Sequence, residues 1–257
     1  MVELIDTHSH IYDEAFREDF EDVVTRSKEQ GVKALVMPGI DIAAYGDMLS
    51  TADRLEGYAF PCIGLHPTSV GEGWQEELDF VRAHARDRRF LAIGEIGLDE
   101  YWSKDFLAEQ KRVFAEQICL AAEMDLPIII HAREATEDIF NVLSDTRGVP
   151  VRGTFHAYSG SYETYRRALT FGDFKFGIGG VVTYKRAGIA EVLPRMSPSD
   201  IVLETDCPWL TPVPYRGRRN ESSYVAIVAA KVAELTGADI GQVARTTTEN
   251  ARKLFDI

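Results

Sequence analysis

The stretch "LPIIIHAR", residues 126–133, places three isoleucines in a row and ends on a histidine and an arginine. An uninterrupted apolar run, without alternation of polar residues, is typical of a strand that is covered on both faces, as in a parallel sheet. Seven further short runs have the same character: "VELID" (2–6), "KALVMPG" (33–39), "YAFPCIG" (58–64), "FLAIGEIG" (90–97), "RGTFHAY" (152–158), "FKFGIGG" (174–180) and "DIVLETD" (200–206). The sequence therefore predicts eight strands.

Helical periodicity fills the segments between these runs. The expected helices cover 15–30, 41–56, 74–86, 105–125, 134–146, 161–171, 185–196, 221–236 and 239–254, and the glycines expected to end helices are Gly31, Gly57, Gly148 and Gly172. Strands that alternate with helices in this way predict a (β/α)8 barrel of the TIM type, formed by one domain over residues 1–257. The alternative is an open doubly wound sheet. Its dinucleotide-binding form is disfavoured, because no GxGxxG follows the first strand.

The charge balance limits the kind of partner. The formal net charge is −13, from 41 acidic and 28 basic residues, whereas a protein that coats nucleic acid over many phosphates is normally basic. A substrate that carries phosphate must then be held locally, with a small footprint. No apolar run reaches the roughly 20 residues of a membrane helix, and no signal peptide is visible. The three cysteines form no CxxC pair, so we expect a reduced, cytoplasmic protein. The sequence contains no readable coiled coil or obvious apolar patch, so we expect a monomer.

Polar side chains with metal-binding chemistry stand where the predicted strands end. They are His8 and His10, His66, Glu95, His131, His156, and Glu204 with Asp206, each group following a different strand. The downstream ends of all strands meet at one mouth of a barrel, where active sites lie. Five of the six histidines fall at such ends, and only His84 lies in a helical pattern. A single histidine there is better explained as a hydrogen-bonded residue at a strand terminus, but five of them with carboxylates favour a metal site.

Imidazoles combined with carboxylates suit first-row divalent ions, so Zn, Mn or Mg are candidates, and a bridging carboxylate suits two ions. One division places His8, His10 and Asp206 on one ion, His131 and His156 on the other, and Glu95 between them. A bound water would become the nucleophile, and Asp206 could orient it or accept its proton. Glu95 and Asp206 are thus the expected catalytic carboxylates.

Several motifs together resemble the TatD-type metal-dependent deoxyribonucleases, a branch of the amidohydrolase-like barrels. They are "DTHSH", "GLHP", "GEIGLDEYW", "PIIIHAR", "HAYSG" and "ETDCPWLTPVPYRGRRNE", and the resemblance runs from Asp6 to Asn250. It implies a TIM-type barrel with a divalent metal centre and hydrolysis of phosphodiester bonds in DNA, often from the 3′ end of single strands. By motif, it implies metal ligands at His8, His10, Glu95, His131, His156 and Asp206. Two departures, "HAYSG" for His-Cys-Phe-Ser-Gly and "NESSYV" for Asn-Glu-Pro, replace none of these ligands.

Substrate contacts are expected from His66, Arg133, Arg216 and Arg218. The last two belong to "RGRR" (216–219), which could equally be a solvated turn; Lys185 and Arg186 are weaker candidates. Tyr101 and Trp102 could stack on a base or could cap the barrel core. Cys207 should point away from Asp206 and lie in the core.

Three functions remain open at this stage. The first is a metal-dependent deoxyribonuclease, with DNA as partner. The second is a hydrolase of another bond class on the same barrel, namely an amidase, an esterase or a D-aminoacyl-tRNA deacylase, because a fold does not determine a substrate. The dinuclear amidases commonly carry a modified lysine where this chain has Glu95. The third is a binding protein without turnover, which is disfavoured because no ligand position is missing.

Overall fold

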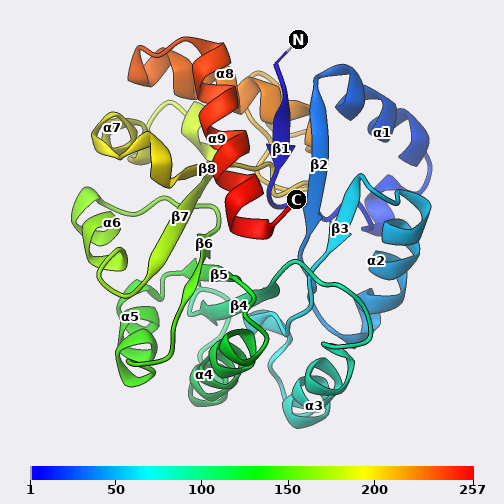
Figure 1. Cartoon of the computed structure of the whole chain (residues 1–257), viewed down its shortest axis with the longest axis vertical. Helices are drawn as coiled ribbons and strands as arrows, with labels where there is room; N and C mark the ends of the chain where they lie inside the picture. Colours follow the sequence, from blue (N-terminus) through cyan, green and yellow to red (C-terminus); the bar gives the residue numbers. More distant parts are fainter. Residues whose placement is uncertain (1) are drawn as a thin grey trace.

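The computed structural model describes residues 2–257, so that Met1 of the expected domain lies outside it. All eight predicted strands are present: β1 (Leu4–Asp6), β2 (Val32–Met37), β3 (Ala59–Pro61), β4 (Ile93–Asp99), β5 (Ile128–Arg133), β6 (Arg152–Phe155), β7 (Asp173–Ile178) and β8 (Ile201–Leu203). They form a ring with the helices outside it (Figure 1), and every strand pair is parallel.

Two seams close the ring. Regular pairing gives a three-stranded sheet, β1-β2-β3, and a five-stranded sheet, β4-β5-β6-β7-β8. Parallel bridges between Ser9 and Cys207 and between Ile63 and Ile93 join the two sheets at both edges. At the first seam the amide of Thr7 donates to the carbonyl of Leu203 at 3.0 Å. The sheet is therefore a closed barrel, and the open doubly wound alternative is wrong.

The expected helices are present, with two differences. They are α1 (Phe20–Glu29), α2 (Ile42–Arg54), α3 (Trp74–His84), α4 (Leu107–Glu123), α5 (Thr136–Asp145), α6 (Tyr162–Ala168), α7 (Ile189–Val192), α8 (Val225–Thr236) and α9 (Ile240–Phe255). The helix expected over 15–30 is divided into the 3-10 turn η1 (Glu14–Phe16) and α1. The helix expected over 185–196 is reduced to α7 and η4 (Leu193–Arg195), because Pro194 has no amide hydrogen to continue it. In residues 2–257 no helix combines the length and the apolar character needed to cross a bilayer.

The end of the barrel where the strands begin is closed by α9, which crosses the centre of the ring in Figure 1. Leu254 and Phe255 of α9 are buried against inward-facing residues such as Val36 and Ile129. The side chain of Asn250 donates to the carbonyl of Ile201 where β8 begins. An apolar plug thus fills the end where the strands start, and polar side chains are left to line the opposite mouth.

Glycines serve different purposes at the expected helix ends. Gly31, Gly57 and Gly148 have positive φ, as expected of residues that end a helix. Gly172 does not belong with them: its φ lies outside that range, and a Cβ there would come within 2.2 Å of the carbonyl oxygen of Val151. Its role is to allow close approach of two backbones.

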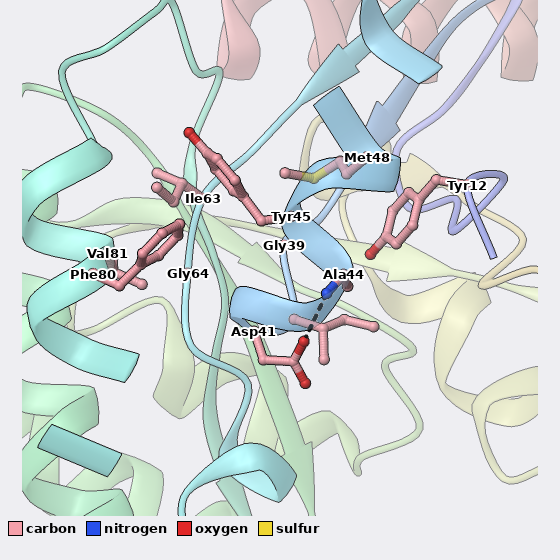
Figure 2. A pocket seen from close by; sticks show the side chains of 11 residues that line it. Tyr12, Gly39, Asp41, Ala44, Tyr45, Met48, Ile63, Gly64, Phe80 and Val81 are labelled. Atoms are coloured by element: carbon pink, nitrogen blue, oxygen red, sulfur yellow. Dashed lines mark hydrogen bonds between the residues drawn. The ribbon is translucent and has the colours of Figure 1, made fainter. Parts of the chain in front are cut away.

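The barrel wall beside β2 and β3 is tightly packed. Asp41 caps α2 by accepting the amide of Ala44 at 3.0 Å, and a hollow beside this turn is lined in part by Tyr12, Tyr45 and Phe80 (Figure 2). Its volume is about 10 Å³, which is room for one water at most. A substrate must therefore approach through the mouth rather than through this wall.

Candidate metal centre

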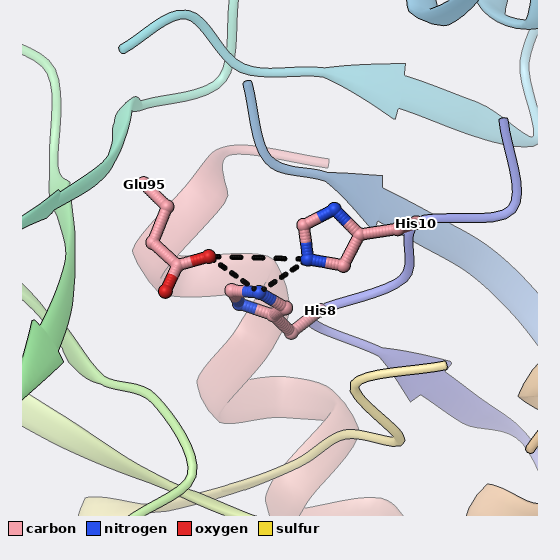
Figure 3. Close-up of side chains that lie close together, drawn as sticks. All are labelled: His8, His10 and Glu95. Carbon is pink, nitrogen blue, oxygen red and sulfur yellow. Dashed lines mark hydrogen bonds and ion pairs between the residues drawn. The ribbon is translucent and has the colours of Figure 1, made fainter. Parts of the chain in front are cut away.

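Two histidines follow β1 and point into the mouth. The side chains of His8 and His10 are 0% and 2% exposed, and their Nε2 atoms lie 3.1 Å apart beside Glu95 (Figure 3). The two residues are separated by one position in an extended segment, so they share a side of the backbone. The segment is anchored to β8 through Asp6, whose carboxylate accepts the amide of Thr205 at 2.9 Å. Burial raises the pKa of Asp6 to about 7.

Glu95, on β4, lies at the centre of the cluster. Its Oε2 atom is 3.0 Å from Nε2 of His8 and 3.9 Å from Nε2 of His10. Its other oxygen, Oε1, faces three more imidazole nitrogens: His131 Nδ1 at 2.8 Å, His156 Nε2 at 3.0 Å and His66 Nε2 at 3.3 Å. One carboxylate thus separates two groups of nitrogen donors, with one oxygen directed at each.

Asp206 completes the first group. Its Oδ1 atom lies 3.6 Å from Nε2 of both His8 and His10. The residue has φ of +57°, and its amide donates to the carbonyl of His8 at 2.9 Å, which turns the side chain inward. Cys207 is directed elsewhere, as expected: it is fully buried, with Sγ 3.2 Å from the hydroxyl of Ser9.

The tautomer of His10 is determined by a chain of hydrogen bonds. The hydroxyl of Tyr12 donates to the carbonyl of Pro38 at 2.5 Å, so its oxygen is free to accept the Nδ1–H of His10 at 2.8 Å. A neutral His10 then carries its proton on Nδ1, and the lone pair of Nε2 is directed at Glu95 and Asp206. This is the arrangement of a metal ligand that is held by an outer hydrogen bond.

His131 shows the same arrangement. Its Nε2 atom lies 2.9 Å from Oδ2 of Asp99, which leaves Nδ1 to face Glu95. The outer carboxylate holds the proton on the far nitrogen and directs a lone pair inward. His156 also directs Nε2 at Glu95, but its Nδ1 atom lies 3.5 Å from Oε1 of Glu204 and forms no hydrogen bond among the described residues.

His66 is arranged in the opposite sense. Its Nδ1 atom accepts the backbone amide of Thr68 at 3.1 Å and therefore carries no proton. A neutral His66 then has its hydrogen on Nε2, directed at Glu95, and is a donor rather than a ligand. From the sequence we expect this residue to contact the substrate, and that role stays a prediction.

The pKa values of the cluster diverge. Burial lowers the pKa of His8, and the neighbouring charge at His156 lowers it further. Burial also opposes the charged form of His156, but Glu95 and Glu204 together outweigh it and raise the pKa of His156 well above its usual value. For His131, hydrogen bonds to Asp99 and Glu95 likewise outweigh burial and raise its pKa. Burial favours protonated Glu95, yet the facing imidazoles hold its pKa well below the ordinary range.

The donor set fits divalent cations. Side chains that each have one potential ligand atom, with these atoms within 4.8 Å of one another, form three sets: His8, His10 and Glu95; His8, His156 and Glu204; His66, Glu95 and His131. His66 would join the third set only after its hydrogen leaves Nε2. Nδ1 of His8, Nδ1 of His156 and Oε2 of Glu204 are buried without a hydrogen-bond partner among the described residues. Buried polar atoms without partners are costly, and these three belong to the residues of the second set, where an ion held through them would supply the missing partner.

Three residues of this arrangement were not assigned from the sequence. Tyr12 and Asp99 were not singled out, and Glu204 was noted only for its place after the eighth strand. A carboxylate four residues after Glu95 on one strand was a usable signal for Asp99. For Tyr12 the spacing of two residues from His10 gave a weaker signal, because a tyrosine at that position also suits the core.

The expected substrate contacts divide into two groups. Arg133 is exposed at the end of β5, two residues after His131. The guanidinium of Arg216 lies 4.4 Å over the ring of Tyr184, and among residues 2–257 no hydrogen bond or ion pair joins Arg216 or Arg218 to the histidine cluster. Arg219, from the same turn, forms an ion pair with Asp19 at 2.7 Å and so secures the turn to the body of the protein.

Comparisons with known proteins agree with these observations. The sequence profile of the family described as TatD related DNase matches residues 5–256. An uncharacterized metal-dependent hydrolase of Bacillus subtilis, YabD, is 38% identical over 99% of both chains. A protein of Erwinia tasmaniensis named 3′-5′ ssDNA/RNA exonuclease TatD is 32% identical over 94% of this chain and 95% of its own length. The crystal structure of the TatD homologue YJJV of Escherichia coli K12 superposes with a TM-score of 0.91 at 27% identity, covering 99% of this chain and 98% of YJJV.

Proposed function

We propose that this chain, which belongs to the TatD-related DNase family of metal-dependent hydrolases, hydrolyses phosphodiester bonds at the 3′ ends of single-stranded DNA. The observation that carries the proposal is Glu95, whose two oxygens each face imidazole nitrogens. A carboxylate in this position is suited to bridge two divalent ions, and pairs of ions are suited to phosphoryl chemistry.

The proposed ligands follow the two groups around Glu95. His8, His10 and Asp206 would hold one ion, His131 and His156 the other, with Glu95 shared. When bound, such ions lower the pKa of a coordinated water towards about 7 and neutralise the charge that builds up on the phosphate.

The chain's own residues would provide the remaining steps. Asp206, whose side chain is 13% exposed against 3% for Glu95, would accept a proton from the attacking water. His66 presents Nε2–H towards the cluster and would donate to a non-bridging phosphate oxygen. Arg133 would contact a neighbouring phosphate from the end of β5.

The direction of attack and the single-stranded substrate are supported by the Erwinia relative, which is named for both. The net charge of −13 supports a short contact with nucleic acid, since a long one needs many cations. The proposal also includes the expectation that residues 1–257 form a single catalytic domain.

The test is digestion of a 5′-labelled single-stranded oligonucleotide with Mg²⁺ or Mn²⁺, with EDTA as the control. We expect metal-dependent shortening from the 3′ end. His131→Ala and Asp206→Ala should remain folded and lose the activity, whereas His84→Ala, which alters the one histidine outside the strand ends, should keep it. Turnover of an amide, a carboxylic ester or a D-aminoacyl-tRNA in place of the oligonucleotide would refute the proposal.

A further inference from the structure

Two aromatic side chains stand exposed beside the metal centre. Trp102 is 69% exposed and Tyr101 is 50% exposed, in the loop that follows β4. Their rings meet edge to face, with centroids 5.0 Å apart. The loop does not cap the barrel core, which was one of the two roles expected for it. A large part of the indole surface is left in contact with water.

The aromatic pair is fixed relative to the histidine cluster by Asp99. One carboxylate oxygen of Asp99 accepts the amides of Tyr101 at 3.0 Å and Trp102 at 3.1 Å. The other oxygen binds Nε2 of His131 at 2.9 Å. A single side chain, that of Asp99, therefore connects the backbone of the aromatic loop to a proposed metal ligand.

A cation accompanies the two rings. The guanidinium of Arg133 lies 3.9 Å from the ring centroid of Tyr101 and 5.3 Å from that of Trp102. Within residues 2–257 no carboxylate pairs with Arg133, and the nearby Glu100 is bound by Lys104 at 2.9 Å. In a chain of net charge −13, this is a cation free to take an anion.

We propose that Trp102, Tyr101 and Arg133 form a subsite for one unpaired nucleotide next to the scissile bond. The base would stack on the exposed indole, and the adjoining phosphate would contact Arg133. The inference rests on the proposed nuclease function and adds a reason for preferring single strands: in a duplex the base is already paired and stacked. A π surface beside a cation is the combination that single-strand-binding proteins use.

The base is expected on the outer face of Trp102. The hollow beneath the indole, lined in part by Thr68, Asp99 and Phe106, has a volume of about 70 Å³. That space suits a few waters and is too small for a nucleobase. The outer face, in contrast, is open to solvent.

The experiment compares two 5′-labelled oligonucleotides that differ only at the 3′ end. One has natural nucleotides, and in the other the last two are replaced by tetrahydrofuran abasic residues, which keep the phosphates and lack the bases. For the wild-type protein we expect the abasic end to lower kcat/KM by about 5- to 100-fold, mainly through KM, since stacking binds substrate and transition state alike. Trp102→Ala should lower kcat/KM on the natural end by a similar factor and show little further loss on the abasic end. Trp102→Phe should restore most of the difference.

The control is Trp209→Ala. Trp209 is 48% exposed on the other side of the mouth, and the edge of its ring contacts His10, with centroids 5.1 Å apart. Its removal should leave the ratio between natural and abasic ends as in the wild type. Equal cleavage of both ends by the wild type, or a ratio that Trp209→Ala removes and Trp102→Ala does not, would overturn the subsite while leaving the nuclease intact. Failure to cleave either end would overturn the nuclease proposal, and the subsite with it.

Discussion

Replacing Tyr12 by phenylalanine removes one oxygen atom and tests whether the tautomer of His10 matters for metal binding. In the wild type, the Tyr12 oxygen accepts Nδ1–H of His10 at 2.8 Å, which leaves Nε2 unprotonated. In Tyr12→Phe a metal-bound His10 must still carry its proton on Nδ1, now without an acceptor. His10 is only 2% exposed, so water does not readily replace the lost partner.

The expected loss of metal affinity depends on whether the metal-bound or the metal-free form of Tyr12→Phe has a buried donor without a partner. A buried donor without a partner costs about 1–3 kcal/mol. The metal-free variant avoids the cost by moving the proton to Nε2, which can donate to Nε2 of His8 at 3.1 Å. The carbonyl of Pro38 loses its donor in both states, so that loss cancels. The whole penalty therefore falls on metal binding, and the dissociation constant should rise by roughly 5- to 150-fold.

The assay is a titration of the metal-free protein with Mn²⁺ or Zn²⁺ in competition with a chelating indicator. Tyr58→Phe is the matched control. Tyr12 and Tyr58 are both 8% exposed, and the hydroxyl of Tyr58 also forms a hydrogen bond, but its partner is Ser27 and not a histidine of the cluster. We expect unchanged affinity in Tyr58→Phe. Wild-type affinity in Tyr12→Phe, or an equal loss in both variants, would refute the reasoning.

Three other predictions concern pH, backbone and salt. In the metal-free protein His131 and His156 have raised pKa values, so they must lose protons before they bind an ion. The affinity for metal should therefore fall as the pH falls, by up to about tenfold per pH unit for each proton released. Calorimetry in buffers of different ionisation enthalpy counts these protons. Gly97→Ala should lower the free energy of unfolding, measured by denaturant titration, by at least about 1–3 kcal/mol, because φ is +137° and the added Cβ would lie 2.1 Å from the carbonyl oxygen of His131. Gly46→Ala on α2, where the added Cβ meets no atom, should raise the same free energy by about 0.5–1 kcal/mol. If Arg133, Arg216 and Arg218 each contact one phosphate, the salt slope for single-stranded DNA should be about −2, and a slope near −10 would show a much larger binding face.

The sequence predicted the strands well because their burial is extreme. Ile128, Ile129 and Ile130 are all at most 1% exposed, and such a run has few alternatives to a strand that is covered on both faces. Short local patterns were less informative. The segment 185–196 has helical periodicity, but Pro194 interrupts it and only α7 and η4 form.

The candidate site could be predicted at the level of residue types at strand ends and no further. The chemistry of each histidine depends on its outer partner, and those partners are determined by register between strands or by the backbone. His66 and His131 look alike in the sequence, yet Thr68 offers one an amide donor and Asp99 offers the other a carboxylate acceptor. No periodicity in the sequence distinguishes a donor from a ligand.

The position of the ions tests the central claim most directly. Crystals of the protein soaked in Mn²⁺ and measured near the manganese absorption edge should show two anomalous peaks, one on each side of the Glu95 carboxylate. One ion should be bound by His8, His10 and Asp206, and the other by His131 and His156. Peaks away from Glu95, or none at millimolar Mn²⁺, would contradict the account.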